Sequence, residues 1–211
     1  MPLTKSEQFA GARKSSYEEM NDDFPTPPWA TRAFFKYVAP NLVTNARRIS
    51  VLEPANGRGY ITKVLKELKF KVAVSDNADY GGGDRVADYL VDKFKPYDLM
   101  VTNPPYKHSN AFVMRGVDEA VMGVAVLMRT LWVTGKFRYD NLFGPRPPSV
   151  IAVFSRNMSA TRGKVIRRGS NVMSHSWFYW DKTGSHPHGK TEFMWIPPGA
   201  QSELERDEDY L

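Results

Sequence analysis

The stretch ISVLEPANGRGY, residues 49–60, decides the fold of this chain. Residues 49–52 are apolar enough for a short buried strand, and apolar positions at helical spacing follow over residues 61–68. A strand, a Gly-x-Gly turn and a helix form the nucleotide-binding half of a doubly wound sheet, in which glycines let the backbone approach a ligand closely. The third glycine of the dinucleotide fingerprint and a Gly-Lys-Ser/Thr sequence are both missing here. NAD and ATP phosphates are therefore weakly supported as ligands.

A second strand is expected over residues 71–76, and it ends in an acidic residue, Asp76. This acid follows the first strand by about twenty residues, the position from which a carboxylate can hydrogen-bond ribose hydroxyls. Asp88 comes after another short loop and is a candidate for binding an adenine amino group.

A third apolar run, residues 97–102, leads into Asn103, Pro104, Pro105 and Tyr106. Two consecutive prolines fix φ, remove two N–H donors and bias Asn103 away from helix. The loop therefore offers one side-chain amide, bare carbonyls and an aromatic ring, which together suit the binding of a planar –NH2 group. On these four residues alone, a simple strand terminator followed by a surface tyrosine is an equally good interpretation.

The remaining patterns predict one domain with a doubly wound, mostly parallel α/β sheet and a late antiparallel strand. Residues 123–128 form a strand without a polar face, which is typical of a sheet covered on both sides. The other expected elements are helices over residues 27–39, 111–122 and 131–142, and strands over residues 150–154, 176–180 and 192–196.

Length and composition limit the domain organisation and the class of protein. A chain of 211 residues with 42% hydrophobic residues is long enough for one well-buried domain. We expect a flexible segment over residues 1–22, a domain over residues 23–198 and an acidic tail over residues 199–211. No signal peptide or membrane-spanning run is evident, so a soluble cytoplasmic protein without a membrane partner is expected.

The absence of cysteine excludes disulfides, thiolate metal sites and the cysteine nucleophile that methylation of a cytosine ring carbon requires. His175, His186 and His188 have no nearby acidic cluster, so we expect no metal site.

Basic residues gather between residues 129 and 168, although the net charge is only +6. Such a run is often a solvated face, but residues 155–164 are also polar and contain glycine, as in a mobile loop. A basic loop of this kind is a candidate clamp on nucleic-acid phosphates. The candidate nucleic-acid-binding residues are Lys107, Arg129, Arg156, Arg162, Lys164, Arg167 and Arg168.

Four features occur in an order that resembles the one found in the S-adenosylmethionine-dependent amino-methyltransferases. They are the turn at residues 53–59, Asp76, Asp88 and the Asn-Pro-Pro-Tyr loop. Within that group the chain looks most like the small phage-type DNA N6-adenine methyltransferases. Residues 23–29, with a Pro-Thr-Pro element, and the aromatic run of residues 177–182 agree with this resemblance. The likeness covers roughly residues 23–198, and no separate target-recognition domain is visible.

The resemblance implies a Rossmann-like class I methyltransferase fold, S-adenosyl-L-methionine as cofactor and transfer of a methyl group to adenine N6 in DNA. The Asn103 oxygen and the Pro104 carbonyl would each accept one N–H of the base, and Tyr106 would stack on it. The implied catalytic residues are Asn103, Pro104, Pro105 and Tyr106. The implied cofactor-binding residues are Thr26, Pro27, Glu53, Pro54, Ala55, Asn56, Gly57, Gly59, Asp76 and Asp88.

Other functions stay open at this point. Exocyclic amines of RNA, protein glutamine and cytosine N4 present the same planar –NH2 group. A nucleic-acid-binding module that keeps the fold without activity is a further alternative. The sequence indicates no oligomeric state.

Overall fold

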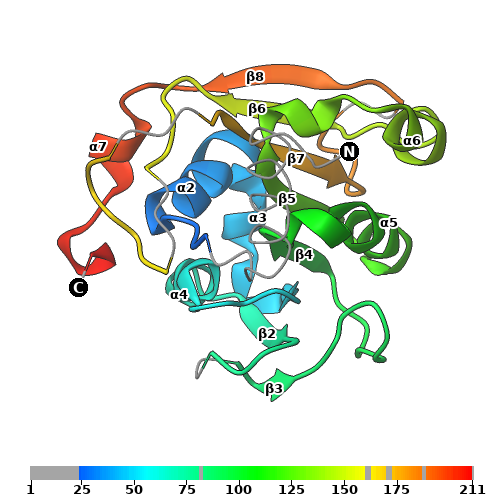
Figure 1. The fold of residues 1–211 in the computed structure, drawn as a ribbon, viewed down its shortest axis with the longest axis horizontal. Helices are drawn as coiled ribbons and strands as arrows, with labels where there is room; N and C mark the ends of the chain where they lie inside the picture. The colour runs from blue at the N-terminus through cyan, green and yellow to red at the C-terminus, as the bar shows by residue number, and fades with distance from the viewer. Residues whose placement is uncertain (1–23, 81–82, 160–162, 170–172, 187–188, 211) are drawn as a thin grey trace, which may run out of the picture.

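The computed structural model describes residues 24–80, 83–159, 163–169, 173–186 and 189–210, and these form an α/β fold around one sheet (Figure 1). The strand order is β3-β2-β1-β4-β5-β7-β6-β8. Strand β7 is antiparallel to both β5 and β6, and the other neighbouring strands are parallel. The strands are β1 (Ser50–Glu53), β2 (Lys71–Asp76), β3 (Arg85–Val86), β4 (Leu99–Thr102), β5 (Gly123–Arg129), β6 (Val150–Phe154), β7 (His175–Asp181) and β8 (Glu192–Ile196). This topology confirms the expected doubly wound sheet with a late antiparallel strand.

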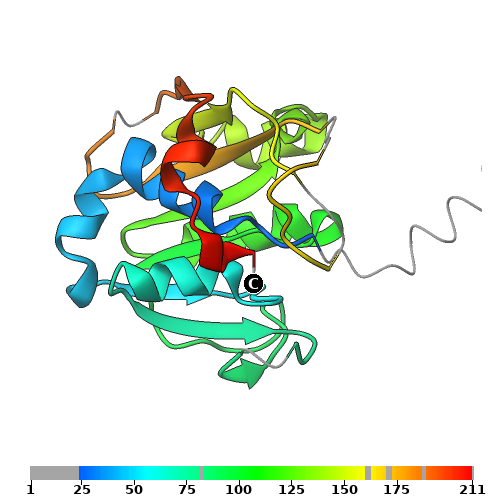
Figure 2. The same ribbon diagram turned by 90° about the vertical axis from the view of Figure 1, so that its left-hand side faces the viewer.

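The direction of winding reverses at β1, which pairs with β2 on one side and with β4 on the other. In open α/β sheets the ligand crevice lies outside the carboxyl ends of the strands at such a reversal. Figure 2 shows β2 pointing toward this edge, where the loop that follows β6 also lies. The edge beyond β1, β2 and β4 is therefore where a functional site is expected.

Helical segments cover both faces of the sheet. On one side lie α2 (Pro28–Ala33), η1 (Phe34–Val38), α3 (Pro40–Thr44), η2 (Ala46–Arg48) and α4 (Tyr60–Glu67). The other side holds η3 (Tyr106–His108), α5 (Ser109–Glu119), η4 (Thr130–Val133), α6 (Lys136–Arg138) and η5 (Tyr139–Phe143). The single helix expected over residues 131–142 is wrong: Gly135, at φ +130°, interrupts it and leaves three short pieces.

The core consists of two apolar clusters, one on each face of the sheet, and successive strand residues alternate between them. In β7, Trp177 and Tyr179 join the cluster under α2, whereas Phe178 and Trp180 join the cluster under α5. Residues 123–128 of β5 are buried throughout, which confirms the prediction of a strand without a polar face.

The acidic C-terminal segment packs on the fold. It contains α7 (Ala200–Leu204) and η6 (Asp207–Asp209), and it lies beside α2 and α4 in Figure 1. Arg32 of α2 bonds both Glu67 of α4 and the buried Asp209. The expected flexible segment, residues 1–22, lies outside the described residues.

Candidate active site

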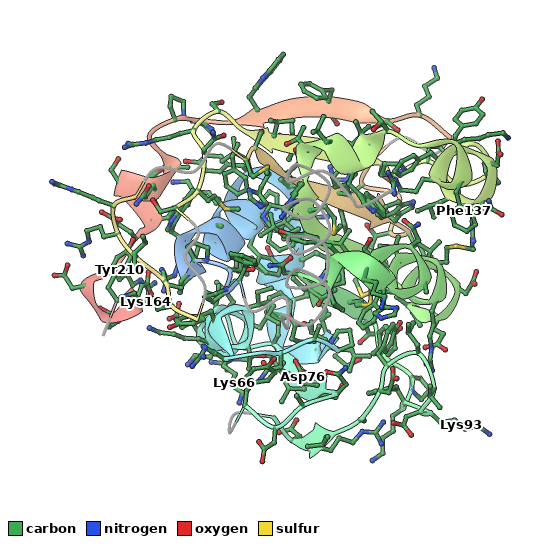
Figure 3. The ribbon with its side chains drawn as sticks, viewed as in Figure 1. Lys66, Asp76, Lys93, Phe137, Lys164 and Tyr210 are labelled. Carbon is green, nitrogen blue, oxygen red and sulfur yellow. The ribbon has the colours of Figure 1, made fainter. Side chains whose placement is uncertain are left out.

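The strands β1, β2 and β4 end at Glu53, Asp76 and Thr102, so the loops that follow them meet at one edge of the sheet. Asp76 is labelled at the end of β2 in Figure 3. The resemblance placed cofactor residues on the first two loops and catalytic residues on the third. The structure brings these three loops together.

The glycine turn after β1 is held by β2. The Asp76 carboxylate accepts the backbone N–H of Gly57 at 2.8 Å and that of Ala78 at 3.1 Å. Gly57 and Gly59 have φ values of +50° and +79°, the left-handed region that glycine adopts at low cost. A Cβ built on Gly57 meets no atom within 4 Å. The turn is therefore rigid yet open at Gly57, where a ligand can approach the backbone.

Several buried polar atoms beside this turn have no hydrogen-bond partner among the described residues. They are Glu53 Oε2, Asn56 Nδ2, Ser75 Oγ and Thr102 Oγ1. The other Glu53 oxygen accepts the Ala55 N–H at 3.0 Å, and the Asn56 oxygen accepts the Thr62 hydroxyl at 2.6 Å. Buried polar groups are nearly always satisfied, so these atoms at the ends of β1, β2 and β4 are candidates for hydrogen bonds to a polar ligand or to water.

Glu53 is fully buried. Burial raises the pKa of its carboxyl well above 4.5, and the negative charge of Asp76 adds to the rise. The Ala55 N–H bond opposes this rise, as does the Thr102 hydroxyl, which lies near the carboxyl but forms no hydrogen bond of regular geometry with it. A cation placed beside Glu53 would favour its ionised form.

The side chain of Asn103 is oriented by the N-terminal end of the described chain. Its Nδ2 donates to the Phe24 carbonyl at 3.2 Å and to the Thr26 hydroxyl at 3.1 Å. Its Oδ1 accepts no hydrogen bond from any residue in the described ranges. Pro105 has an extended backbone, with φ −57° and ψ 128°, and Pro104 is buried. The loop thus presents an amide oxygen from a rigid support.

Tyr106 is contacted by two residues that come from β5 and β7. The Arg129 guanidinium lies 4.5 Å from the centroid of the Tyr106 ring, and the Tyr106 hydroxyl lies 3.5 Å from His175 Nε2. Burial and the charge of Arg129 lower the pKa of His175 to about 4, although a bond to the Met173 carbonyl opposes this. A neutral His175 can accept the Tyr106 hydroxyl proton through Nε2.

The sequence analysis weighed His175 only as a metal ligand and so missed this contact. The register of β5 with β7 pairs Arg129 with His175. Knowing that register would have placed both residues beside the loop, but nothing in the local sequence reveals it. Within the described ranges, no group of three or more histidine or acidic residues could hold a metal ion.

The remaining expected cofactor residues lie around the same edge. Pro54 is buried and Ala55 half-buried in the glycine turn, and Pro27 is buried at the start of α2, where its carbonyl accepts the Ala30 N–H. Asp88 is exposed, and its carboxylate caps the N–H of Leu90 at 2.8 Å.

The expected nucleic-acid-binding residues differ in their surroundings. Lys107, Arg156, Lys164 and Arg168 are exposed. Arg129 is also exposed, and its guanidinium lies over the ring of Tyr106. Arg167 instead pairs with Asp207 and lies over the ring of Tyr210, which is labelled on the same side as Lys164 in Figure 3. Arg162 lies outside the described residues. Arg167 is therefore engaged by the C-terminal segment, which the charge pattern alone did not indicate.

No family model and no curated protein matches this chain. Solved structures do match. A protein from Listeria monocytogenes, described as a class I S-adenosylmethionine-dependent methyltransferase, is 13% identical over 95% of this chain and 75% of its own, with a TM-score of 0.55. A protein from Pyrococcus horikoshii, described as an RNA methyltransferase, is 13% identical over 86% of this chain and 99% of its own, with a TM-score of 0.51. The M protein of the type I restriction enzyme EcoKI is 13% identical over 88% of this chain and 49% of its own, with a TM-score of 0.54.

These likenesses identify the fold as the Rossmann-like class I methyltransferase fold, as expected from the sequence. In the described part of the chain, no helix has both the length and the apolar character needed to cross a membrane.

Proposed function

We propose that this protein is an S-adenosylmethionine-dependent methyltransferase that methylates the exocyclic N6 of adenine in DNA. The observation that carries the proposal is the orientation of Asn103. Its amide oxygen accepts no bond from the described residues and is held at the sheet edge shared with the open glycine turn.

The residues after β1 and β2 fit the cofactor. Gly57 leaves space for a close approach, and Asp76 is placed at the strand end from which a carboxylate can bind ribose hydroxyls. The orphaned Glu53 oxygen suits the positive charge of the methionine portion. When bound, S-adenosylmethionine would supply an electrophilic methyl group, so these residues would hold it with that group toward Asn103.

An exocyclic amine is a poor nucleophile because its lone pair is delocalised into the ring. Acceptance of its two N–H groups by Asn103 Oδ1 and the Pro104 carbonyl would direct the lone pair toward the methyl group. The same fixed acceptors would stabilise the positive charge that develops on nitrogen during transfer. The proton becomes acidic only after alkylation, so no strong base is required beforehand.

Tyr106 would stack on a base that has left the helix, which is worth about 1–3 kcal/mol. Arg129 covers one face of its ring, so the base would use the other face. The exposed cations Lys107, Arg156, Lys164 and Arg168 would contact phosphates.

RNA is the second candidate acceptor, because one similar structure is described as an RNA methyltransferase. Transfer of a tritiated methyl group to unmethylated DNA, to structured RNA and to a protein release factor, which tests a glutamine side chain as acceptor, separates the alternatives. We expect label in DNA that elutes as N6-methyladenosine after digestion to nucleosides. Label confined to RNA or protein would overturn the DNA assignment, and no transfer to any of them would overturn the proposed activity.

Gly57→Ala should weaken cofactor binding by about tenfold or more, because its methyl group points into the space that the ligand would use. Gly184 is the matched control. It also has positive φ (+82°) and nothing within 4 Å of an added Cβ, but it follows β7, which ends at the opposite sheet edge. Gly184→Ala should cause similar backbone strain without loss of affinity. Titration calorimetry measures both, and equal affinities in the two variants would contradict the assignment of the turn.

Cofactor binding should release a proton from Glu53. Its pKa is raised in the free protein, and a bound cation would lower it, so affinity should increase as the pH rises toward the pKa of the free protein. The folded protein keeps the proton of Glu53 to a higher pH than the unfolded chain does. The free energy of unfolding should therefore fall as the pH rises from 4.5 toward the folded-state pKa of Glu53. Calorimetry in buffers of different ionisation enthalpy detects the released proton. In Glu53→Gln that part of the release should vanish, and an unchanged release would contradict this role.

A further inference from the structure

The amide of Asn103 could in principle face its substrate in either of two ways. The oxygen and nitrogen of a carboxamide have nearly the same shape, so a half-turn of the side chain exchanges acceptor for donor. Only the oxygen can bind an amino group. Whatever holds the amide in one orientation therefore determines which substrate the loop recognises.

The Phe24 carbonyl sets the polarity of this amide. A carbonyl can only accept, so the atom of Asn103 that lies 3.2 Å from it must be the donor nitrogen. After a half-turn, two acceptors would face one another in a partly buried place. Leaving such a group unsatisfied disfavours the turned state by roughly tenfold to a hundredfold.

Thr26 supplies the second contact, at 3.1 Å from the same nitrogen. Its side chain is buried, and α2 begins two residues later with six buried residues, so the hydroxyl has a firm support. Because a hydroxyl can donate or accept, this contact fixes the plane of the amide rather than its polarity. Both amide hydrogens are then used, which leaves Oδ1 for a hydrogen bond to a substrate N–H.

We propose that Thr26 is a positioning residue for Asn103. Its hydroxyl holds the Asn103 amide together with the Phe24 carbonyl, and that carbonyl is the obligate hydrogen-bond acceptor. This inference rests on the proposed function, since it assigns Thr26 to the orientation of the amide that binds the substrate –NH2. It differs from the cofactor-binding role that the resemblance implied for Thr26. A base with a keto oxygen in place of the amino group would meet a second acceptor and be rejected.

Thr26→Val keeps the shape and removes the hydroxyl. We expect turnover at saturating cofactor to fall about tenfold, as for loss of one hydrogen bond, with the cofactor Kd unchanged within about twofold and recovery in Thr26→Ser. Thr31 is the matched control, since it is buried on α2 with a hydroxyl that bonds no described residue. Thr31→Val should keep wild-type turnover. Wild-type turnover in Thr26→Val, or a loss seen only in the cofactor Kd, would overturn the proposal.

Hydrogen exchange of the Asn103 side-chain amide, followed by 15N NMR, provides a readout that does not need activity. The amide protons should exchange slowly in the wild type and in Thr31→Val, and faster in Thr26→Val. If the wild type methylates no acceptor, the proposed function fails, but this difference in exchange would still support the positioning role. Equal exchange in all three proteins would overturn it.

Discussion

Replacing Asn103 with alanine is expected to lower turnover by about a hundred- to a thousandfold, the usual cost of removing one preorganised contact that acts on developing charge. The side-chain oxygen would matter most in the transition state, when positive charge forms on the attacking nitrogen. Affinity for the cofactor and for DNA should therefore change much less than turnover. Single-turnover rates at saturating cofactor and DNA measure the chemical step directly.

Asn103 also bonds Phe24 and Thr26, so its removal could loosen the N-terminal segment. Thermal unfolding and cofactor titration of the same variant test for that effect. Asn141→Ala is a suitable control, because Asn141 is exposed and its amide donates to the Phe137 carbonyl, its one hydrogen bond among the described residues. Methylation by Asn103→Ala at the wild-type rate would mean that the loop is a structural terminator, and the proposed chemistry would be wrong.

The strands were the most predictable part of the fold. The ranges expected for residues 71–76, 150–154 and 192–196 agree with β2, β6 and β8. β5 has no polar face because helices cover both sides of the sheet, and this produces a continuous apolar run in the sequence. The helix expected over residues 131–142 is wrong because the prediction relied on apolar residues at helical spacing and gave too little weight to Gly135. That glycine has a positive φ, which a right-handed helix does not contain.

The meeting of the three loops at one sheet edge was predictable, but the contacts that orient their side chains were not. Asn103 lies 77 residues from Thr26, and no local pattern connects them. The contact of Arg129 and His175 with Tyr106 depends on the register of two antiparallel strands. The basic run predicted Arg167 to bind phosphate. Its partner Asp207 comes 40 residues later in the sequence, in a segment expected to be a separate tail. In each case long-range packing determines which contacts the side chain makes.

Replacing Arg32 with methionine is expected to lower the free energy of unfolding by about 3–5 kcal/mol, the usual cost of removing one partner of a buried ion pair. Arg32 is 7% exposed, and its guanidinium makes five hydrogen bonds, two each to Asp209 and Glu67 and one to the Leu204 carbonyl. The Asp209 side chain is completely buried, so without Arg32 its charge would keep, among the described residues, the more distant Lys63 ammonium at 3.4 Å and the Arg206 N–H at 3.1 Å. Urea unfolding measures the change.

An exposed pair on the same surface is the matched control. Lys36 of η1 pairs with Glu203 of α7, and both side chains are more than two-fifths exposed. Since such pairs contribute little, Lys36→Met should leave the urea midpoint essentially unchanged. Equal midpoints for Arg32→Met and Lys36→Met would contradict the assigned importance of the buried pair.

The pH dependence supplies a second test of Arg32. Burial acts to raise the pKa of Asp209, but the bonds from Arg32 and from the Arg206 N–H leave it below 3.8. A lowered pKa stabilises the folded protein above 3.8 and loses its effect as the pH falls through the folded-state value. The difference in stability between wild type and Arg32→Met should therefore be largest near neutral pH and shrink below about pH 4. Because α2 begins two residues after Thr26, loss of this anchor should also increase hydrogen exchange of the Asn103 amide. A constant difference across the pH range would mean that Arg32 acts through packing rather than through the charge of Asp209.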